Sequence, residues 1–246
     1  MATAISNTTT NTTTTTTTTT DAVVSDPHAL LRLFHLVSPA LPVGAYAYSQ
    51  GLEYAVHAGW IRDEAGTLAW LEGLSSRAVG TLDLPILYRL QRAWQAGDLS
   101  AVDRWNAQLL ASRETAELRA EDLHLGGALA RVLIELEVPA AGRWTERPTA
   151  FATLFALAAT QWRIDAADTL HGYLWAWSEN QILAAIKLVP LGQSAGQRLL
   201  HRLIQSMPRI VERARHLGDG EIGVAVVSQT LASSWHESQY SRLFRS

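Results

Sequence analysis

The sequence contains no cysteine, a single lysine and no long hydrophobic run. The lack of cysteine excludes disulfide frameworks, thiolate nucleophiles, zinc fingers and iron–sulfur clusters. The strongest apolar run, residues 151–160, is too short to cross a bilayer, and no signal peptide is visible. We therefore expect a soluble, cytoplasmic protein that does not span a membrane.

Charge is also scarce, because Asp, Glu, Lys and Arg together make up 17% of the chain and the formal net charge is −3. This balance excludes a global basic field that would drive binding to nucleic acid or to an anionic membrane. Any polyanionic partner would need a local basic patch. Lys187 is the one lysine among 20 basic residues. Either its position requires a compact ammonium group that a planar guanidinium group cannot replace, or the lysine occurs there by chance.

The first 25 residues contain a threonine tract, residues 8–20, that is interrupted only by Asn11. A hydroxyl-rich stretch with nothing apolar to bury cannot offset its ordering entropy, so we expect residues 1–25 to be a disordered tail. The remaining residues, 26–246, belong to a chain that is 48% hydrophobic and can fill one large core. We predict a single domain there.

Helix signals dominate that domain. Asp26 and Pro27 predict a helix start, Asp63 predicts another, and apolar residues recur at three- and four-residue steps over residues 118–136 and 200–214. Pro208 is expected to kink or restart the last of these helices. Strand signals are poor. We therefore predict an all-α bundle of about ten helices with tryptophan-rich packing between them.

Two carboxylate–histidine pairs at three-residue spacing, Glu121/His124 and Asp168/His171, raise the possibility of a metal site. Di-iron bundles use this spacing twice and add one carboxylate from each of two further helices. Candidates for those additional ligands are Glu53, Glu72 and Glu114. The alternative is that the histidines are ordinary surface or capping residues.

Familiar catalytic signatures are missing. The sequence has neither a G-x-x-x-x-G-K-[ST] phosphate loop nor a G-x-S-x-G nucleophile elbow. The glycine-containing stretch 192–197 has no lysine, so it is interpreted as a helix-capping turn.

Two segments look too specific for a simple helical core. Residues 38–53 combine two prolines, glycines and two tyrosines, which predicts either a rigid loop whose rings fill the core or a shaped surface for a partner. The last residues, 236–246, concentrate aromatic, leucine and arginine side chains, the types that anchor interfaces. We predict that this end of the chain docks or binds a partner. An arginine finger toward a partner's nucleotide is a further option.

Both segments, together with residues 179–193 (ENQILAAIKLVPLGQ), closely resemble the UreF family of urease accessory proteins, and the resemblance runs from Leu30 to Ser246. It implies an all-α homodimer without catalysis of its own and without a stably bound cofactor. It also implies assembly with UreD (called UreH in some systems) and the GTPase UreG on apo-urease. Nickel is then the transferred ion, delivered to urease in a process coupled to GTP hydrolysis.

The resemblance also suggests roles for individual residues. The UreD-binding surface would comprise Tyr48, Gln50, Glu53, Gln239, Tyr240, Ser241, Arg242, Leu243, Phe244 and Arg245. The GTPase would face Lys187, Glu179 and Asn180. If nickel passes through the protein, Glu53, His57, Glu121 and His124 are candidates by residue type alone. A departure from the family pattern is the presence of Ala45 and Ala47, where bulkier or polar residues are common.

Three hypotheses therefore stand. The first is a non-enzymatic assembly chaperone for urease. The second is a carboxylate-bridged helical oxidase that uses the two carboxylate–histidine pairs. The third is an independent GTPase regulator that uses Lys187 and the arginines at the end of the chain.

Overall fold

The structure is a computed structural model that describes residues 1–2, 4 and 27–246. The predicted disordered tail, apart from residues 1, 2 and 4, lies outside the described residues. The described part of the chain contains ten α-helices and no strand, which confirms the predicted all-α bundle. The α-helices are α1 (Pro27–Leu36), α2 (Leu52–His57), α3 (Glu64–Leu74), α4 (Leu84–Ala96), α5 (Leu99–Ala111), α6 (Ala116–Glu135), α7 (Phe151–Gln161), α8 (Ala166–Leu188), α9 (Gln193–His216) and α10 (Val227–His236).

Short polar side chains start several of these helices. Asp63 accepts a hydrogen bond from the N–H of Gly66 at 2.8 Å, and Thr115 accepts one from the N–H of Leu118 at 3.2 Å. Each bond satisfies a backbone donor that the first turn leaves unpaired. The predicted starts at Pro27 and at Asp63 are confirmed.

One of the two outcomes expected at Pro208 of α9, a restart of the helix, is wrong. The helix continues unbroken through Pro208 instead of restarting there. Proline removes the hydrogen bond to the carbonyl four residues earlier, and that carbonyl belongs to Ile204, which is exposed. Water can hydrate the freed oxygen, so the helix tolerates the proline on its outer face.

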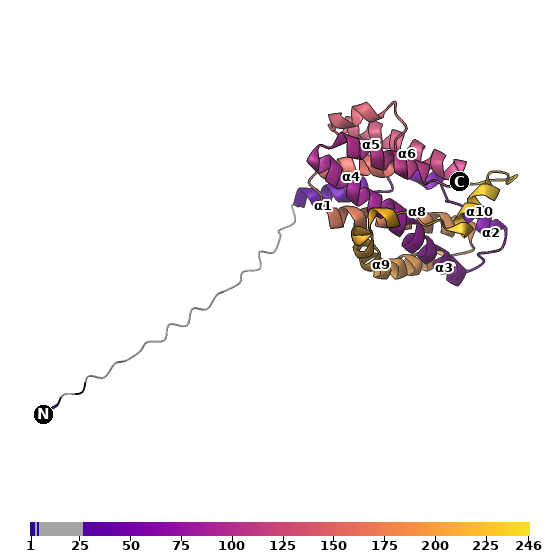
Figure 1. The fold of residues 1–246 in the computed structure, drawn as a ribbon. Helices are drawn as coiled ribbons and strands as arrows, with labels where there is room; N and C mark the ends of the chain where they lie inside the picture. The colour runs from indigo at the N-terminus through magenta and orange to yellow at the C-terminus, as the bar shows by residue number, and fades with distance from the viewer. Residues whose placement is uncertain (3, 5–26) are drawn as a thin grey trace.

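The core is built around α7, whose residues 152–159 are all buried. Helices α4, α6 and α8 pack against it, and α9 packs on the other side of α8 and α4. Figure 1 shows α5 and α6 on one side of this centre, and α3 and α9 on the opposite side. Helices α2 and α10 and the C-terminus lie together at one end of the bundle. No helix among residues 27–246 is long and apolar enough to cross a membrane.

A π-helical segment, Ser75–Asp83, joins α3 to α4 without a break. It carries Asp83 into the interior, where Arg113 donates to Asp83 at 2.5 Å and to Asp122 at 2.8 Å. The hydroxyl of Tyr173 also donates to Asp83, at 3.2 Å. Wide helical turns of this kind are rare and often occur near functional sites. Here the turn brings a charged group into a network that connects α4, α6 and α8.

Close packing at Gly126 gives a stability test. An added Cβ at Gly126 would overlap the carbonyl oxygen of Thr149, whereas at Gly127 the nearest atom is the flexible Arg131 Nη1 at 3.7 Å. Gly126→Ala is expected to lower the free energy of unfolding by about 2 kcal/mol or more, because the backbone must move. Gly127→Ala should raise it by about 0.5–1 kcal/mol through helix propensity. Urea titrations of both variants provide the measurement, and equal effects would contradict the packing.

Candidate functional site

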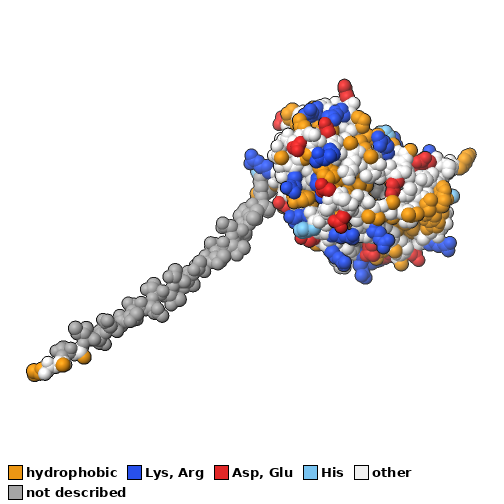
Figure 2. Space-filling view, in the orientation of Figure 1, with side chains coloured by type: hydrophobic (Ala, Val, Ile, Leu, Met, Phe, Trp, Pro, Cys, Tyr) orange, Lys and Arg blue, Asp and Glu red, His pale blue; other side chains and the backbone are white. Residues whose placement is uncertain are grey.

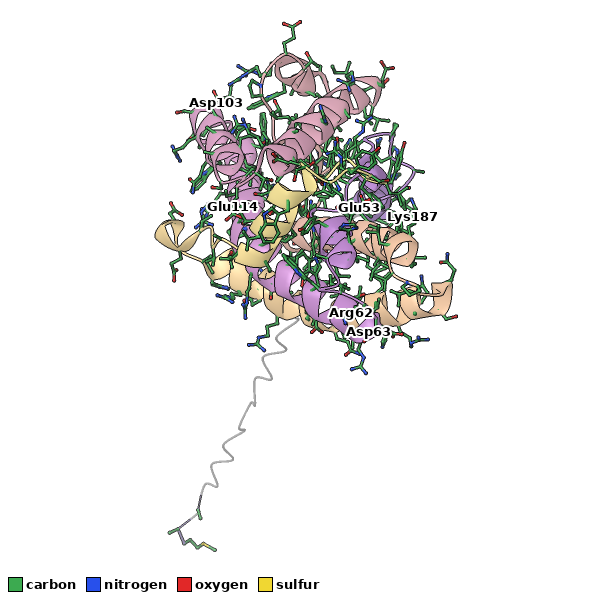
Figure 3. All side chains as sticks on the ribbon, turned by 90° about the vertical axis from the view of Figure 1, so that its right-hand side faces the viewer. Glu53, Arg62, Asp63, Asp103, Glu114 and Lys187 are labelled. Carbon is green, nitrogen blue, oxygen red and sulfur yellow. The ribbon has the colours of Figure 1, made fainter. Side chains whose placement is uncertain are left out.

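The turn before α2, helix α8 and the C-terminal segment (residues 239–246) meet at one end of the bundle. They include most of the three stretches that the sequence singled out, residues 38–53, 179–193 and 236–246. Figure 3 looks onto this end and shows Glu53 of α2 close to Lys187 of α8. Contacts among the three stretches define the candidate site.

Glu53 lies at the centre of these contacts and is buried. Its carboxylate accepts hydrogen bonds from the backbone N–H of Leu243 at 2.6 Å and of Phe244 at 2.8 Å. The Nε2 atom of His236 lies 3.1 Å from the same carboxylate. A charged acceptor makes such bonds about twice as strong as neutral ones. Glu53 therefore fixes the C-terminal segment to the chain itself.

A second carboxylate, that of Glu117, contacts the same histidine as Glu53. Glu117 of α6 lies 2.8 Å from Nδ1 of His236 and accepts from Arg242 at 2.9 Å. Both ring nitrogens of the fully buried His236 thus lie beside carboxylates. This network connects α2, α6, α10 and the C-terminal segment.

The final residues are also held. The N–H of Arg245 donates to the carbonyl of Ala47 at 2.8 Å, and the N–H of Ser49 donates to the carbonyl of Ser246 at 2.8 Å. The hydroxyl of Ser246 donates to Glu121 at 3.3 Å. The sequence predicted that this end of the chain docks or binds a partner. In the structure the segment is already seated on its own chain.

The turn before α2, the tyrosine turn that carries Tyr46 and Tyr48, contacts both α6 and α8. The buried Tyr48 pairs its hydroxyl with Nδ1 of His124 at 2.8 Å, and its carbonyl accepts from Asn180 at 3.3 Å. Burial raises the pKa of the Tyr48 hydroxyl, and a hydrogen bond from Arg245 opposes that rise. Tyr48 therefore serves the interior of the site instead of offering its ring to solvent.

Gln50 bridges two helices, with a backbone φ of 54° that non-glycine residues rarely adopt. Its amide donates to Glu121 at 2.9 Å and its oxygen accepts from the indole of Trp177 at 2.8 Å. Burial raises the pKa of Glu121 to about 7, against the opposing hydrogen bond from Gln50 and the positive charge of Arg113. The strained backbone at Gln50 is stabilised by these contacts on both sides.

Phe244 connects the C-terminal segment to α8. Its buried ring lies in an apolar cluster that includes Leu52, Ala185 and Val189. The Nζ atom of the exposed Lys187 lies 5.6 Å from the ring centroid, within the range of a cation–π contact. The lone lysine thus lies beside the C-terminal segment.

Other residues of the segment face outward. Tyr240 is fully exposed and Leu243 is 65% exposed. The side-chain amide of Gln239 donates to the carbonyl of Ser241 at 2.9 Å, while its Oε1 atom is buried without a hydrogen-bond partner. The side chains of Tyr240 and Leu243 are available to a partner, whereas the backbone of residues 243–246 is already bonded.

A cavity of about 400 Å³ opens between the tyrosine turn, α6 and α8. Its polar lining includes Gln50, Glu121 and Arg113, and also Glu179 and Asn180. Burial raises the pKa of Glu179 as well. The two residues that were predicted to accompany Lys187 therefore line this cavity.

The predicted metal ligands do not come together. Glu53 and Glu121 are buried and bonded as described, His57 is exposed, and His124 pairs with Tyr48. In the second pair, Nδ1 of His171 lies 2.8 Å from the carbonyl of Ala167, within α8. The described residues contain no group of three or more His, Asp or Glu side chains placed to hold a metal ion. The dinuclear interpretation therefore has no support in this geometry.

Sequence reasoning missed several residues of the site. Glu117 and His236 lie 119 residues apart in the chain. Sequence spacing therefore does not predict their contact. Ser49 was not singled out within its segment, although it holds the carbonyl of Ser246. The one available signal for Glu117 is its position four residues before Glu121, on the same face of α6.

Titration of Glu121 gives a pH test. Since its pKa is raised from 4.5 to about 7 in the folded protein, the stability that its protonated form supports is lost as pH rises through that interval. Glu121→Gln mimics the protonated acid and removes this loss. Between pH 4.5 and 8 the variant should gain about 3 kcal/mol relative to the parent. Urea unfolding across this pH range measures the gain.

A matched control is Glu135→Gln, which changes an exposed carboxylate on the same helix. It should leave the pH profile of the parent unchanged. A Glu121→Gln profile parallel to that of the parent would contradict the raised pKa.

Comparisons with known proteins identify the family. The UreF family model matches residues 61–204. The urease accessory protein UreF of Alkalilimnicola ehrlichii is 51% identical over 216 residues, which cover 87% of this chain and 95% of the relative. The UreF of Teredinibacter turnerae is 51% identical over 217 residues, covering 88% and 98%. The UreF of Hahella chejuensis is 48% identical over 220 residues, covering 89% and 99%. The chain therefore belongs to the UreF family of urease accessory proteins.

Proposed function

We propose that this protein is a non-catalytic chaperone that helps to insert nickel into apo-urease. It acts as a cytoplasmic homodimer, in a complex with UreD (or UreH) and the GTPase UreG, and modulates GTP hydrolysis by UreG. Nickel is cargo in this proposal, held by the partners and not bound stably here. Membership of the urease accessory family supports the assignment to urease maturation.

The observation that carries the proposal is the convergence of the three stretches on one surface. Tyr240 and Leu243 project from the C-terminal segment, while Glu53 and Phe244 hold its backbone in place. Exposed aromatic and apolar side chains on a rigid support are typical of the anchors of protein interfaces. The segment therefore offers UreD a surface that is already shaped.

Within this surface we assign two kinds of role. Gln239, Tyr240, Ser241, Arg242, Leu243 and Arg245 supply direct contacts to UreD. The buried Phe244, together with Tyr48, Gln50 and Glu53, holds this segment in position. Lys187 is exposed next to Phe244, and Glu179 and Asn180, which precede it on α8, line the cavity of about 400 Å³. These three are assigned to the surface that meets the GTPase.

The double variant Tyr240→Ala/Leu243→Ala tests the proposal. Both side chains are exposed, so the fold should persist while the affinity for UreD falls about tenfold or more through loss of two anchors. Co-purification with tagged UreD measures binding, and the nickel content of urease matured with the variant measures the consequence.

Leu99→Ala/Ile134→Ala is the control, because it removes two exposed apolar side chains on α5 and α6. It should bind UreD as the parent does. Full UreD binding and full nickel loading with the Tyr240→Ala/Leu243→Ala variant would overturn the proposal.

A further inference from the structure

Helix α9 carries five arginines, Arg198, Arg202, Arg209, Arg213 and Arg215, and a single acidic residue, Glu212. The whole chain, in contrast, has a formal net charge of −3. In Figure 2 several blue side chains lie on the lower part of the body, where Figure 1 places α9, and others lie on its upper part. The helix is thus a local basic surface on an acidic protein.

Three of these arginines form one stripe, which we call the α9 arginine stripe: Arg202, Arg209 and Arg213. They are separated by seven and four residues, so they point to the same side of the helix. With a rise of 1.5 Å per residue, the stripe spans about 16 Å. All three side chains are exposed.

The stripe has no partner within the described residues. Neither Arg202 nor Arg209 nor Arg213 makes a hydrogen bond, ion pair or ring contact there. The other arginines of the helix are paired, because Arg198 donates to Glu64 at 2.6 Å and Arg215 lies 3.5 Å from Glu212. Within α9, the unpaired arginines are therefore those of the stripe.

The arrangement costs the helix stability. Arg198 and Arg202 are four residues apart, as are Arg209 and Arg213, and like charges at this spacing destabilise a helix. The first turn of α9 also lacks an acidic residue that would favour the helix dipole. These charge positions destabilise the helix and bring no compensating contact inside the chain. Such departures from the usual helix pattern are expected at functional surfaces.

The other face of α9 holds the stripe rigidly. Leu199, Leu203, Ile210 and Ala214 are buried against the core. A helix whose apolar face is buried in its own protein cannot insert that face into a bilayer, which argues against membrane binding. Beyond the stripe the protein is acidic overall, so the continuous phosphate charge of a nucleic acid would meet repulsion.

We propose that the α9 arginine stripe binds an acidic protein surface whose carboxylates match its spacing. The fitting partner element is a helix with glutamates seven and four residues apart. Guanidinium groups suit carboxylates because two parallel N–H···O bonds form at once. This surface lies on α9, separate from the site assigned to UreD and the GTPase.

A labelled helical peptide of roughly 20 residues, with glutamates at the spacing of the stripe, tests the proposal. Fluorescence anisotropy at several salt concentrations measures its binding to the full chain. Arg202→Gln/Arg209→Gln/Arg213→Gln should weaken binding about tenfold or more. The control Arg131→Gln/Arg143→Gln/Arg163→Gln removes the same charge from exposed positions elsewhere and should bind as the parent does.

A charge swap sharpens the test. The variant Arg202→Glu/Arg209→Glu/Arg213→Glu should reject the acidic peptide and bind the same peptide with lysines in place of glutamates. Three results would overturn the proposal: equal weakening in the stripe and control variants, no binding of the acidic peptide to the parent, or tighter binding of a DNA duplex or of anionic phosphatidylserine vesicles than of the peptide.

Discussion

The carboxylate of Glu53 is almost completely removed from water, yet its two oxygens accept from two backbone N–H groups and lie beside His236. A buried charge of this kind is tolerated only when it is paired and hydrogen-bonded. Removing one partner of a buried pair costs about 3–5 kcal/mol, because the other charge is left unsatisfied. The position of the C-terminal segment, and of everything that it touches, depends on this one acceptor.

The consequences spread through neighbouring helices. His236 contacts both Glu53 and Glu117 and so connects α2 to α6. Phe244 packs the C-terminal segment against α8, beside Lys187. Ser246 joins the same segment to Glu121, which in turn holds Gln50. Buried polar networks of this kind specify a single arrangement when every member is satisfied. These buried contacts therefore determine the shape of the surface that we assign to UreD.

Features that depend on neighbours in the chain were predictable. Caps such as Asp63 and the apolar steps of α6 and α9 act over three or four residues, so the sequence reveals them directly. The restart expected at Pro208 does not occur, because Ile204, whose carbonyl loses its hydrogen bond, is exposed. The contacts of Glu117 with His236 and of Arg113 with Asp83 join distant helices, and no spacing encodes them. The three stretches of the site were recognisable one by one, but their convergence is a tertiary property.

The most direct test of this account is hydrogen exchange, read by mass spectrometry, over residues 239–246. We expect the amides of Leu243 and Phe244 to be protected in the parent and to exchange about tenfold faster or more in Glu53→Gln, because a neutral amide is a weaker acceptor. Glu237→Gln, which changes an exposed carboxylate at the end of α10, should leave this protection intact. Unprotected amides in the parent, or protection that survives Glu53→Gln unchanged, would contradict the central role of Glu53.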